Sequence, residues 1–117
     1  MFIPAMPHRH ILSVTCLFLG PLSLAAKPDF NRDIRPILSD KCFKCHGPDA
    51  KNQKSKLRLD SFANATKDYD GVVALVPGDV KESEIHWRIR SDDSTEVMPP
   101  PKAKLPLTEK EKDLLEQ

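Results

Sequence analysis

The chain has 117 residues, of which 30% are charged and 39% hydrophobic, so it fits one small domain and is neither a membrane bundle nor wholly disordered. Its 18 Lys and Arg residues nearly balance its 17 Asp and Glu residues, which disfavours a broad nucleic-acid-binding face. Three cysteines are too few for a disulfide scaffold.

The first residues read as a secretory signal peptide, which we place at residues 1–26. Arg9 and the amino terminus give a positive end, residues 11–24 carry no charge, and small residues follow. Cleavage after Ala25 or after Ala26 fits equally well. The apolar run is shorter than the roughly 20 residues of a membrane-spanning helix, so we expect no span after cleavage and an exported, periplasmic or secreted product. An uncleaved amphipathic anchor is the alternative.

The remaining residues, 27–117, are expected to form one domain, and its first element is a helix over about 31–41. One helical face is marked by apolar residues at i, i+4, i+7 and i+8, namely Phe30, Ile34, Ile37 and Leu38. Asp29 or Asn31 can cap the start of this helix. Pro36 lacks an amide hydrogen, so it either lies in the first turn of a helix that begins near Arg35 or kinks a longer one.

The middle of the chain predicts short elements separated by polar turns. In chain order these are a polar loop over 47–56, an extended stretch over 57–60, a short helix over 62–66, a strand-like run over 72–76 and a helix through Ile85, Trp87 and Ile89. Asp60 or Ser61 can cap the short helix. Asp79 with Glu82 is compatible with a capping box, and Ser83 is a second possible cap for the following helix. Residues 98–101 form a rigid, proline-rich segment.

The last predicted element is a helix that starts at a capping box made by Thr108 and Glu111. The sequence ends at Gln117, just where this helix gains its apolar residues. We therefore expect a truncated last helix and a chain that is part of a longer, multidomain protein.

The strongest motif is Cys42-Phe43-Lys44-Cys45-His46, which has the C-x-x-C-H spacing of c-type haem attachment. Two thiols three positions apart can form thioether bonds with the two vinyl groups of one haem, and the adjacent imidazole of His46 can bind the iron. About 91 residues remain after loss of the leader, and a domain this small is marginal without a stabilising group. One covalently attached haem c per chain would supply that group.

Other uses of the two cysteines are weaker. A zinc site would need two more ligands, for which His86 and a carboxylate are the available completion. A thioredoxin-like redox pair needs a strand and helix context that this region does not predict. A structural disulfide between Cys42 and Cys45 would close a very tight loop.

The second axial position of the iron has two candidate ligands, Met98 and His86. Met98 precedes Pro99 and Pro100, which stiffen its loop and lower the entropy cost of presenting the thioether to the iron. His86 lies on a predicted helix and is more simply structural. We therefore predict His46 and Met98 as the iron ligands, a pair that raises the reduction potential relative to two imidazoles.

The combined pattern resembles the planctomycete-type cytochrome c domain over about residues 30–117. The resemblance rests on residues 33–38 (Asp-Ile-Arg-Pro-Ile-Leu), on Cys42 to Pro48, and on shorter matches at 57–60, 77–78, 83–84, 88–89, 98–100 and 107–108. It implies an all-α, small cytochrome c-like helical domain wrapped around one covalently bound haem, in which the terminal helix packs against the first. It also implies Cys42 and Cys45 as attachment sites, His46 as the proximal ligand and Met98 as the distal one.

The sequence therefore predicts an electron carrier and not an enzyme, acting with redox partner proteins of unknown identity and without nucleic acid. A haem-containing redox module of a larger oxidoreductase or a peroxidase is the enzymatic alternative, and a haem or gas sensor or a zinc-bound structural module is the binding alternative. Arg58 could pair with a haem propionate, although a solvated side chain is the simpler interpretation. The apolar haem pocket is expected to use Leu57, Leu59, Val73, Leu75, Ile85 and Trp87.

Overall fold

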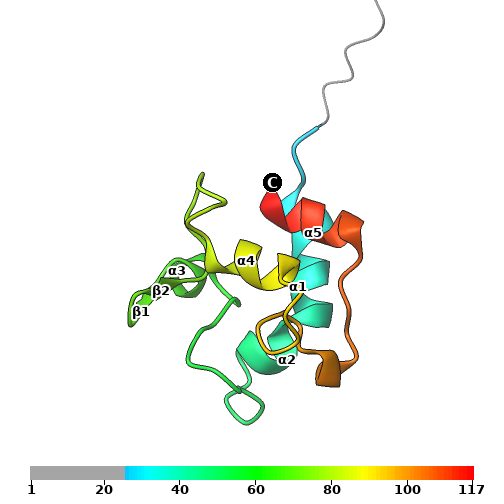
Figure 1. Ribbon diagram of the computed structural model, residues 1–117. Helices are drawn as coiled ribbons and strands as arrows, with labels where there is room; N and C mark the ends of the chain where they lie inside the picture. The colour runs from blue at the N-terminus through cyan, green and yellow to red at the C-terminus, as the bar shows by residue number, and fades with distance from the viewer. Residues whose placement is uncertain (1–25) are drawn as a thin grey trace, which may run out of the picture.

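The computed structural model describes residues 26–117, so the predicted leader lies almost wholly outside the described part of the chain. The described chain folds into short helices joined by long irregular segments (Figure 1): α1 (Arg35–Lys41), α2 (Phe43–His46), α3 (Phe62–Ala65), α4 (Glu84–Arg90) and α5 (Glu109–Glu116). A small hairpin of β1 (Asp68–Tyr69) and β2 (Val72–Val73) lies between α3 and α4. The domain is mostly helical, as predicted, but the all-α description is corrected by this hairpin.

The first predicted helix forms in two parts because of Pro36. A π-helical turn over Phe30–Ile34 precedes α1, and Asp29 caps it by accepting a hydrogen bond from the Arg32 amide at 2.8 Å. Pro36 lies in the first turn of α1, where a helix has no use for the missing amide hydrogen. The first of the two predicted arrangements around Pro36 is therefore the observed one.

The hairpin replaces the strand that was predicted over 72–76. Asp70 and Gly71 have positive φ values of 58° and 88°, which suit the tight two-residue turn that joins β1 to β2. Pairing ends at Val73, because the chain then turns inward: Ala74 is buried, and the Leu75 amide donates to the carbonyl of Ala65 at 3.0 Å. The strand is thus shorter than predicted and has a partner that the sequence analysis did not identify.

The side chains of Asp79 and Ser83 together hold the turn before α4, and the helix starts after Ser83 and not at the predicted capping box. Ser83 is the N-cap by position, but its side chain makes no capping hydrogen bond. The carboxylate of Asp79 accepts from the amides of Lys81 and Glu82, both at 3.1 Å, and so closes a turn that is not part of α4. Ser83 is 5% exposed; its hydroxyl donates to the Asp79 carbonyl at 2.7 Å and accepts from the Val76 amide at 2.9 Å. The predicted box at Asp79 is therefore wrong as a helix start, because its donors belong to the turn.

The last helix, α5, starts as predicted. Thr108 and Glu111 form a complete capping box in which each side chain accepts from the other residue's backbone amide. The helix packs on α4 and on the π-helical turn near the N-terminus, the arrangement that the family resemblance implied.

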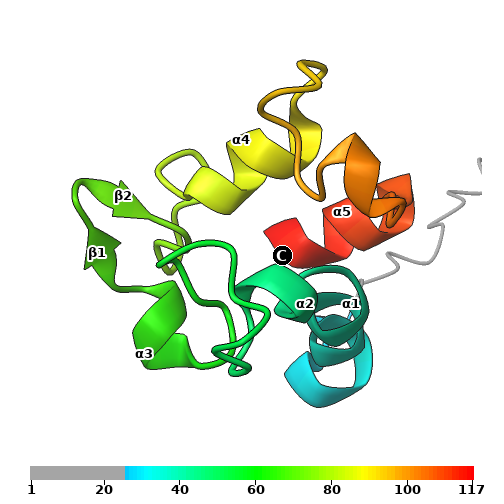
Figure 2. The same cartoon turned by 90° about the horizontal axis from the view of Figure 1, so that it is seen from below.

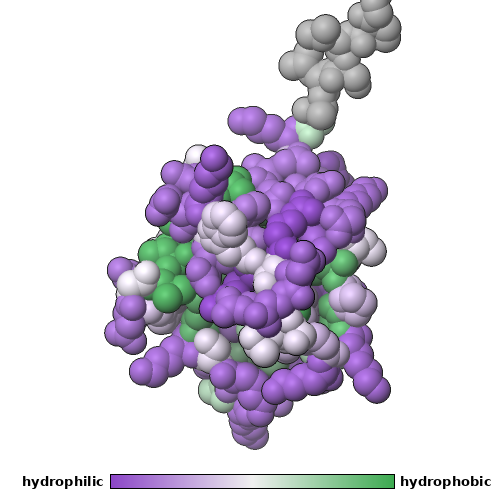
Figure 3. Space-filling view, viewed as in Figure 1, coloured by the Kyte–Doolittle hydropathy of each residue, from purple (hydrophilic) through white to green (hydrophobic). Residues whose placement is uncertain are grey.

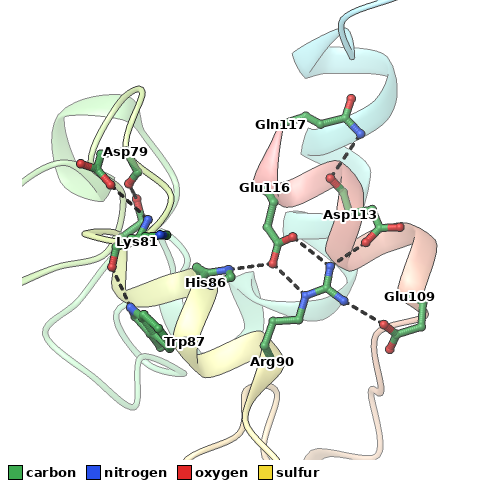
Figure 4. A network of polar contacts seen from close by, with 10 residues as sticks. Asp79, Lys81, His86, Trp87, Arg90, Glu109, Asp113, Glu116 and Gln117 are labelled. Atoms are coloured by element: carbon green, nitrogen blue, oxygen red, sulfur yellow. Dashed lines mark hydrogen bonds and ion pairs between the residues drawn. The ribbon is translucent and has the colours of Figure 1, made fainter. Parts of the chain in front are cut away.

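Ion pairs connect α5 to α4 through the single guanidinium of Arg90 (Figure 4). This group contacts Glu109 at 2.8 Å, Asp113 at 2.6 Å and Glu116 at 2.8 Å. Glu116 also accepts from His86 Nδ1 at 2.8 Å, so two side chains of α4 hold the end of α5.

The buried core is very small for a chain of this length. Within residues 26–117 its buried apolar members are Ile37, Leu38, Ala65, Ala74 and Ile89. Large apolar side chains remain on the surface, among them Phe62, which is 71% exposed. In the space-filling view the hydrophobic residues gather mainly on the side where α3 and the hairpin lie (Figure 3).

Candidate functional site

The C-x-x-C-H motif forms one turn of helix. The amides of Cys45 and His46 donate to the Cys42 carbonyl at 3.1 and 2.9 Å, and α2 contains all of the motif after Cys42. Positions i, i+3 and i+4 lie on one face of a helix, so the two thiols and the imidazole share a side. This helix was not predicted from sequence, because four residues are too few to show a hydrophobic period.

His46 is hydrogen-bonded to residues 57–59, the segment that follows the polar loop after the motif. Its Nδ1 lies 2.9 Å from the carbonyl oxygen of Leu57, an acceptor, so the proton belongs on Nδ1 and the lone pair on Nε2 is free. The His46 carbonyl accepts from the Leu59 amide at 2.8 Å. A metal-binding histidine is held in the same way, with its second ring nitrogen donating to a carbonyl.

A cleft of about 1040 Å³ opens in front of this face. Its volume is at the upper end of the roughly 300–1,000 Å³ that ligand sites occupy. The walls come from α2, the loop that follows it, the β1–β2 hairpin, α4 and the segment around Met98, and Figure 2 shows these elements around one region of the molecule. Apolar side chains make up much of the lining: Leu57, Leu59, Val72, Ile85, Ile89, Met98 and Leu105.

All four predicted site residues line this one cleft: Cys42, Cys45, His46 and Met98. Met98 is half-buried, and its amide donates to the Arg88 carbonyl at the end of α4 at 2.9 Å. The structure thus brings together two chain segments that are about 50 residues apart, and α4 positions the second of them.

The predicted apolar pocket is correct only in part. Leu57, Leu59 and Ile85 line the cleft, whereas Val73, Leu75 and Trp87 are not part of its lining. Trp87 is 57% exposed, and its indole donates to the Lys81 carbonyl at 2.7 Å on the outer side of α4. It is neither core nor cleft, because the α4 face that turns inward carries Ile85 and Ile89 instead.

Arg58 has a local partner. It forms an ion pair with Asp60, with Nε at 3.0 Å from the carboxylate, and it does not line the cleft. This contact supports the simpler interpretation of a surface ion pair over a role toward a haem propionate.

The rival metal arrangements find no support in the described part of the chain. Residues 26–117 contain no group of three or more His, Cys, Asp and Glu side chains placed to hold a metal ion, and Cys42 and Cys45 are free thiols. His86 is hydrogen-bonded to Glu116 and borders a different cavity of about 380 Å³, which lies between the segment before α4 and the end of α5. His86 is thus not among the groups that face the cleft.

The environment of Cys42 favours the protonated thiol. Burial, and to a lesser degree the neighbouring Cys45, raises the pKa of the Cys42 thiol to about 11.

Gly47 does not line the cleft, but it shapes the chain directly after His46, a role that was not predicted from sequence. It is buried, and a Cβ atom placed on it would lie 2.3 Å from the Phe43 carbonyl oxygen. Only glycine lets the chain leave the motif so close to the preceding turn. Its place directly after His46 was the available signal.

The cleft fits a large, flat, mostly apolar group held by two thioethers and an imidazole. It is wide enough, it is lined by aliphatic side chains, and it carries two free thiols on one helical face next to an oriented imidazole. Such a group would also complete a core that otherwise contains few buried side chains.

The comparisons agree with this geometry. The family model described as planctomycete cytochrome C matches residues 42–102, which is more than half of the chain and includes all four predicted site residues. No curated protein and no solved structure matches the chain.

Proposed function

Because the chain belongs to the planctomycete cytochrome C family, we propose that residues 27–117 carry one covalently attached haem c and transfer single electrons. The observation that carries this proposal is the cleft that gathers two cysteines, a histidine and a methionine from segments far apart in sequence. The haem would supply the redox chemistry, by cycling between ferric and ferrous iron.

Each residue has a distinct role in this proposal. Cys42 and Cys45 anchor the haem through thioether bonds. His46 offers Nε2 to the iron, since Nδ1 is engaged with the Leu57 carbonyl. Met98 offers its thioether as the distal ligand, and this neutral sulfur favours the ferrous state more than a second imidazole would.

The other residues of the cleft would exclude water from the haem and hold the Met98 loop rigid. Leu57, Leu59 and Ile85 supply an apolar wall, which lowers the local dielectric around the redox centre. The hydrogen bond from the Met98 amide to the Arg88 carbonyl holds the loop of Met98 against α4, and it would limit the movement of that loop between oxidation states. If Met98 and His46 both bound the iron, no position would remain on it for a substrate, and an electron carrier would be favoured over a peroxidase.

An exported location accompanies this function. Thioether attachment in bacteria takes place outside the cytoplasm, which agrees with the leader proposed for residues 1–26. No helix of residues 26–117 has the length and apolar character needed to cross a membrane.

Co-expression with a cytochrome c maturation system tests the proposal. The expected product has the mass of the processed chain plus one haem, and its reduced-minus-oxidised spectrum shows the bands of a c-type cytochrome. A colourless product with the mass of the bare polypeptide would overturn the proposal.

The distal ligand is tested by Met98→Ala, with His86→Gln as the matched control. Met98→Ala should abolish the sulfur-to-iron charge-transfer band and lower the reduction potential, while His86→Gln, which keeps a hydrogen-bonding side chain, should leave both unchanged. An unchanged spectrum in Met98→Ala would reject Met98. If Met98→Ala and the parent protein also turned over peroxide at equal rates, the peroxidase alternative would replace the proposal of an electron carrier.

A further inference from the structure

The loop that carries Met98, residues 91–98, has an internal hydrogen-bond network. The Glu96 amide donates to the Asp93 carbonyl at 3.0 Å, and the Asp93 carboxylate accepts from the amide and the hydroxyl of Thr95 at 2.8 and 2.7 Å. These bonds join residues close in sequence, so they fix the shape of the loop but not its place in the domain.

One residue of α4 makes the polar contacts that place this loop. The Arg88 carbonyl accepts from the Met98 amide at 2.9 Å, and Arg88 Nη1 donates to the carboxylate and the carbonyl of Glu96 at 3.3 and 3.4 Å. Within residues 26–117, these are the hydrogen bonds and ion pairs that link residues 92–98 to any segment outside the loop. The polar contacts that hold Met98 at the cleft therefore converge on Arg88.

The Arg88 guanidinium is oriented from its own helix. Its Nε donates to Glu84 Oε1 at 2.7 Å, an i,i+4 pair with the acidic residue first, which is the favourable order on a helix. Because the guanidinium is a planar fork, fixing Nε also directs Nη1. The Arg88 and Glu96 side chains are 35% and 58% exposed, so their ion pair contributes little to overall stability. Its effect is on the position of the loop.

We propose that Arg88 is the positioning residue for the distal iron ligand: its guanidinium, set by Glu84, holds the loop so that Met98 stays at the cleft. This inference rests on the proposed function, in which Met98 binds the iron. Arg88 also lines the cleft, so pairing with a haem propionate is its alternative role. The two carboxylates that already neutralise Arg88 favour the positioning role.

The first experiment measures how readily added imidazole replaces Met98 in the haem-loaded ferric protein. Arg88→Met removes the guanidinium and keeps an aliphatic side chain of similar reach in the cleft lining. Arg90→Met is the matched control, because Arg90 lies on the same helix and is paired with three carboxylates of α5, but does not line the cleft.

Arg88→Met should bind imidazole about fivefold more tightly than the parent, because the loop loses an ion pair that favours its closed position. The rate of imidazole binding at saturation, which reports loop opening, should rise by a similar factor. Arg90→Met should stay within about twofold of the parent in both measurements, although its thermal stability falls. Equal effects of the two variants would overturn the proposal, since a general loss of stability would then explain them.

A double-mutant cycle separates the positioning role from the propionate role. Glu96→Ala removes the partner on the loop and leaves Arg88 free to pair with a propionate. It should tighten imidazole binding by itself, and it should have little further effect when added to Arg88→Met. Parental affinity in Glu96→Ala would overturn the proposal. A shift of the midpoint potential in Arg88→Met alone would then assign Arg88 to a propionate.

Amide hydrogen exchange of the haem-loaded protein tests the same opening without an added ligand. The Met98 amide should exchange faster in Arg88→Met than in the parent, while the Ile85 amide, which donates to the Ala74 carbonyl at 3.0 Å, should be unchanged. Equal acceleration at both amides would mean that the whole domain is loosened, and would overturn the positioning role.

Failure of this inference can be distinguished from failure of the proposed function. A parent protein without haem, or without the sulfur-to-iron band, refutes the proposed ligation, and the positioning role falls with it. A parent protein with haem and with that band, whose Arg88→Met variant binds imidazole as Arg90→Met does, refutes the positioning role alone.

Discussion

Gly47 sets the geometry of the chain directly after the C-x-x-C-H motif. Any side chain at this position would bring Cβ to 2.3 Å from the Phe43 carbonyl oxygen, which is backbone and has no freedom to move aside. The turn would have to open, and the imidazole of His46 is one residue away.

We therefore expect Gly47→Ala to lower the free energy of unfolding by about 2 kcal/mol, the usual scale of an overpacked buried site. The yield of haem-loaded protein should fall as well. Urea unfolding of the purified holoprotein measures the first effect. Pro48→Ala, at the exposed neighbouring residue, is the control and should change stability by less than about 0.5 kcal/mol. A fully stable Gly47→Ala protein would show that the turn relaxes easily.

At the same scale, the sequence predicted residues that the fold does bring to one cleft, while their hydrogen-bond partners were not predictable. Cys42, Cys45 and His46 were marked by the spacing that haem attachment would need, and Met98 was marked by its prolines. The carbonyl of Leu57 as the acceptor for His46 could not be predicted, because every residue has a carbonyl and only the fold selects one. Trp87 was misplaced for a related reason: its size suggested burial, but its register on α4 points it outward.

The junction between α4 and α5 depends on ionised Glu116. Hydrogen bonds from Arg90 first, and then from His86, lower the pKa of Glu116 from its ordinary value to about 2. A carboxyl group whose pKa is lower in the folded than in the unfolded chain stabilises the fold above its unfolded pKa, and this contribution disappears as the pH falls toward the folded pKa. The contribution is therefore complete near neutral pH and is lost between about pH 4.5 and pH 2.

Glu116→Gln should reduce stability at pH 6 by about 1 kcal/mol, given that both partners are partly exposed and screened by solvent. Its stability should also fall less steeply than that of the parent between pH 4.5 and pH 2. Denaturant unfolding followed by far-UV circular dichroism at several pH values measures both effects. Glu82→Gln, an exposed carboxylate outside this network, should follow the parent curve. If stability fell with pH in the same way for Glu116→Gln and for the parent, ionised Glu116 would not be the group that stabilises this junction.

Among the elements, those with a strong local signal were predicted best. The capping box at Thr108 placed the start of α5, and Pro36 placed the start of α1, because both act on the hydrogen bonds of adjacent residues. The hairpin was missed although Asp70-Gly71 is a favourable two-residue turn, because two-residue strands show no alternation. The helix start predicted at Asp79 was wrong, because a side chain that accepts hydrogen bonds from two backbone amides can close a turn as well as start a helix.

The whole domain contains few buried apolar side chains for its size. Five buried residues, two of them alanines, form the core, and a cleft of about 1040 Å³ lies beside them. A domain of about 90 residues buries only roughly 60–65% of its chain surface, so the proposed haem would supply a major part of the hydrophobic contribution.

We expect Cys42→Ala/Cys45→Ala to lose haem attachment and, with it, cooperative unfolding. Near-UV circular dichroism and a thermal scan of the purified variant should show weak tertiary signal and no sharp transition, in contrast to the haem-loaded parent. His86→Gln, which keeps both thiols, should retain a cooperative transition. A haem-free variant that melts sharply would mean that the polypeptide alone suffices for the fold.

The cleft itself could not be predicted from sequence at this scale. Its walls come from five separate parts of the chain, which meet only in the folded domain. Local patterns predict elements and single ligands, whereas the shape between elements depends on how they pack.

His46 has a structural role as well as the one proposed for it. It holds the segment after its loop through both its ring and its backbone carbonyl, which reach Leu57 and Leu59. Replacing this residue therefore removes the ring's tether as well as the proposed iron ligand, and a simple substitution would not separate the two losses. Adding free imidazole to a His46→Gly protein separates them, since the small molecule restores the donor but cannot rebuild the tether.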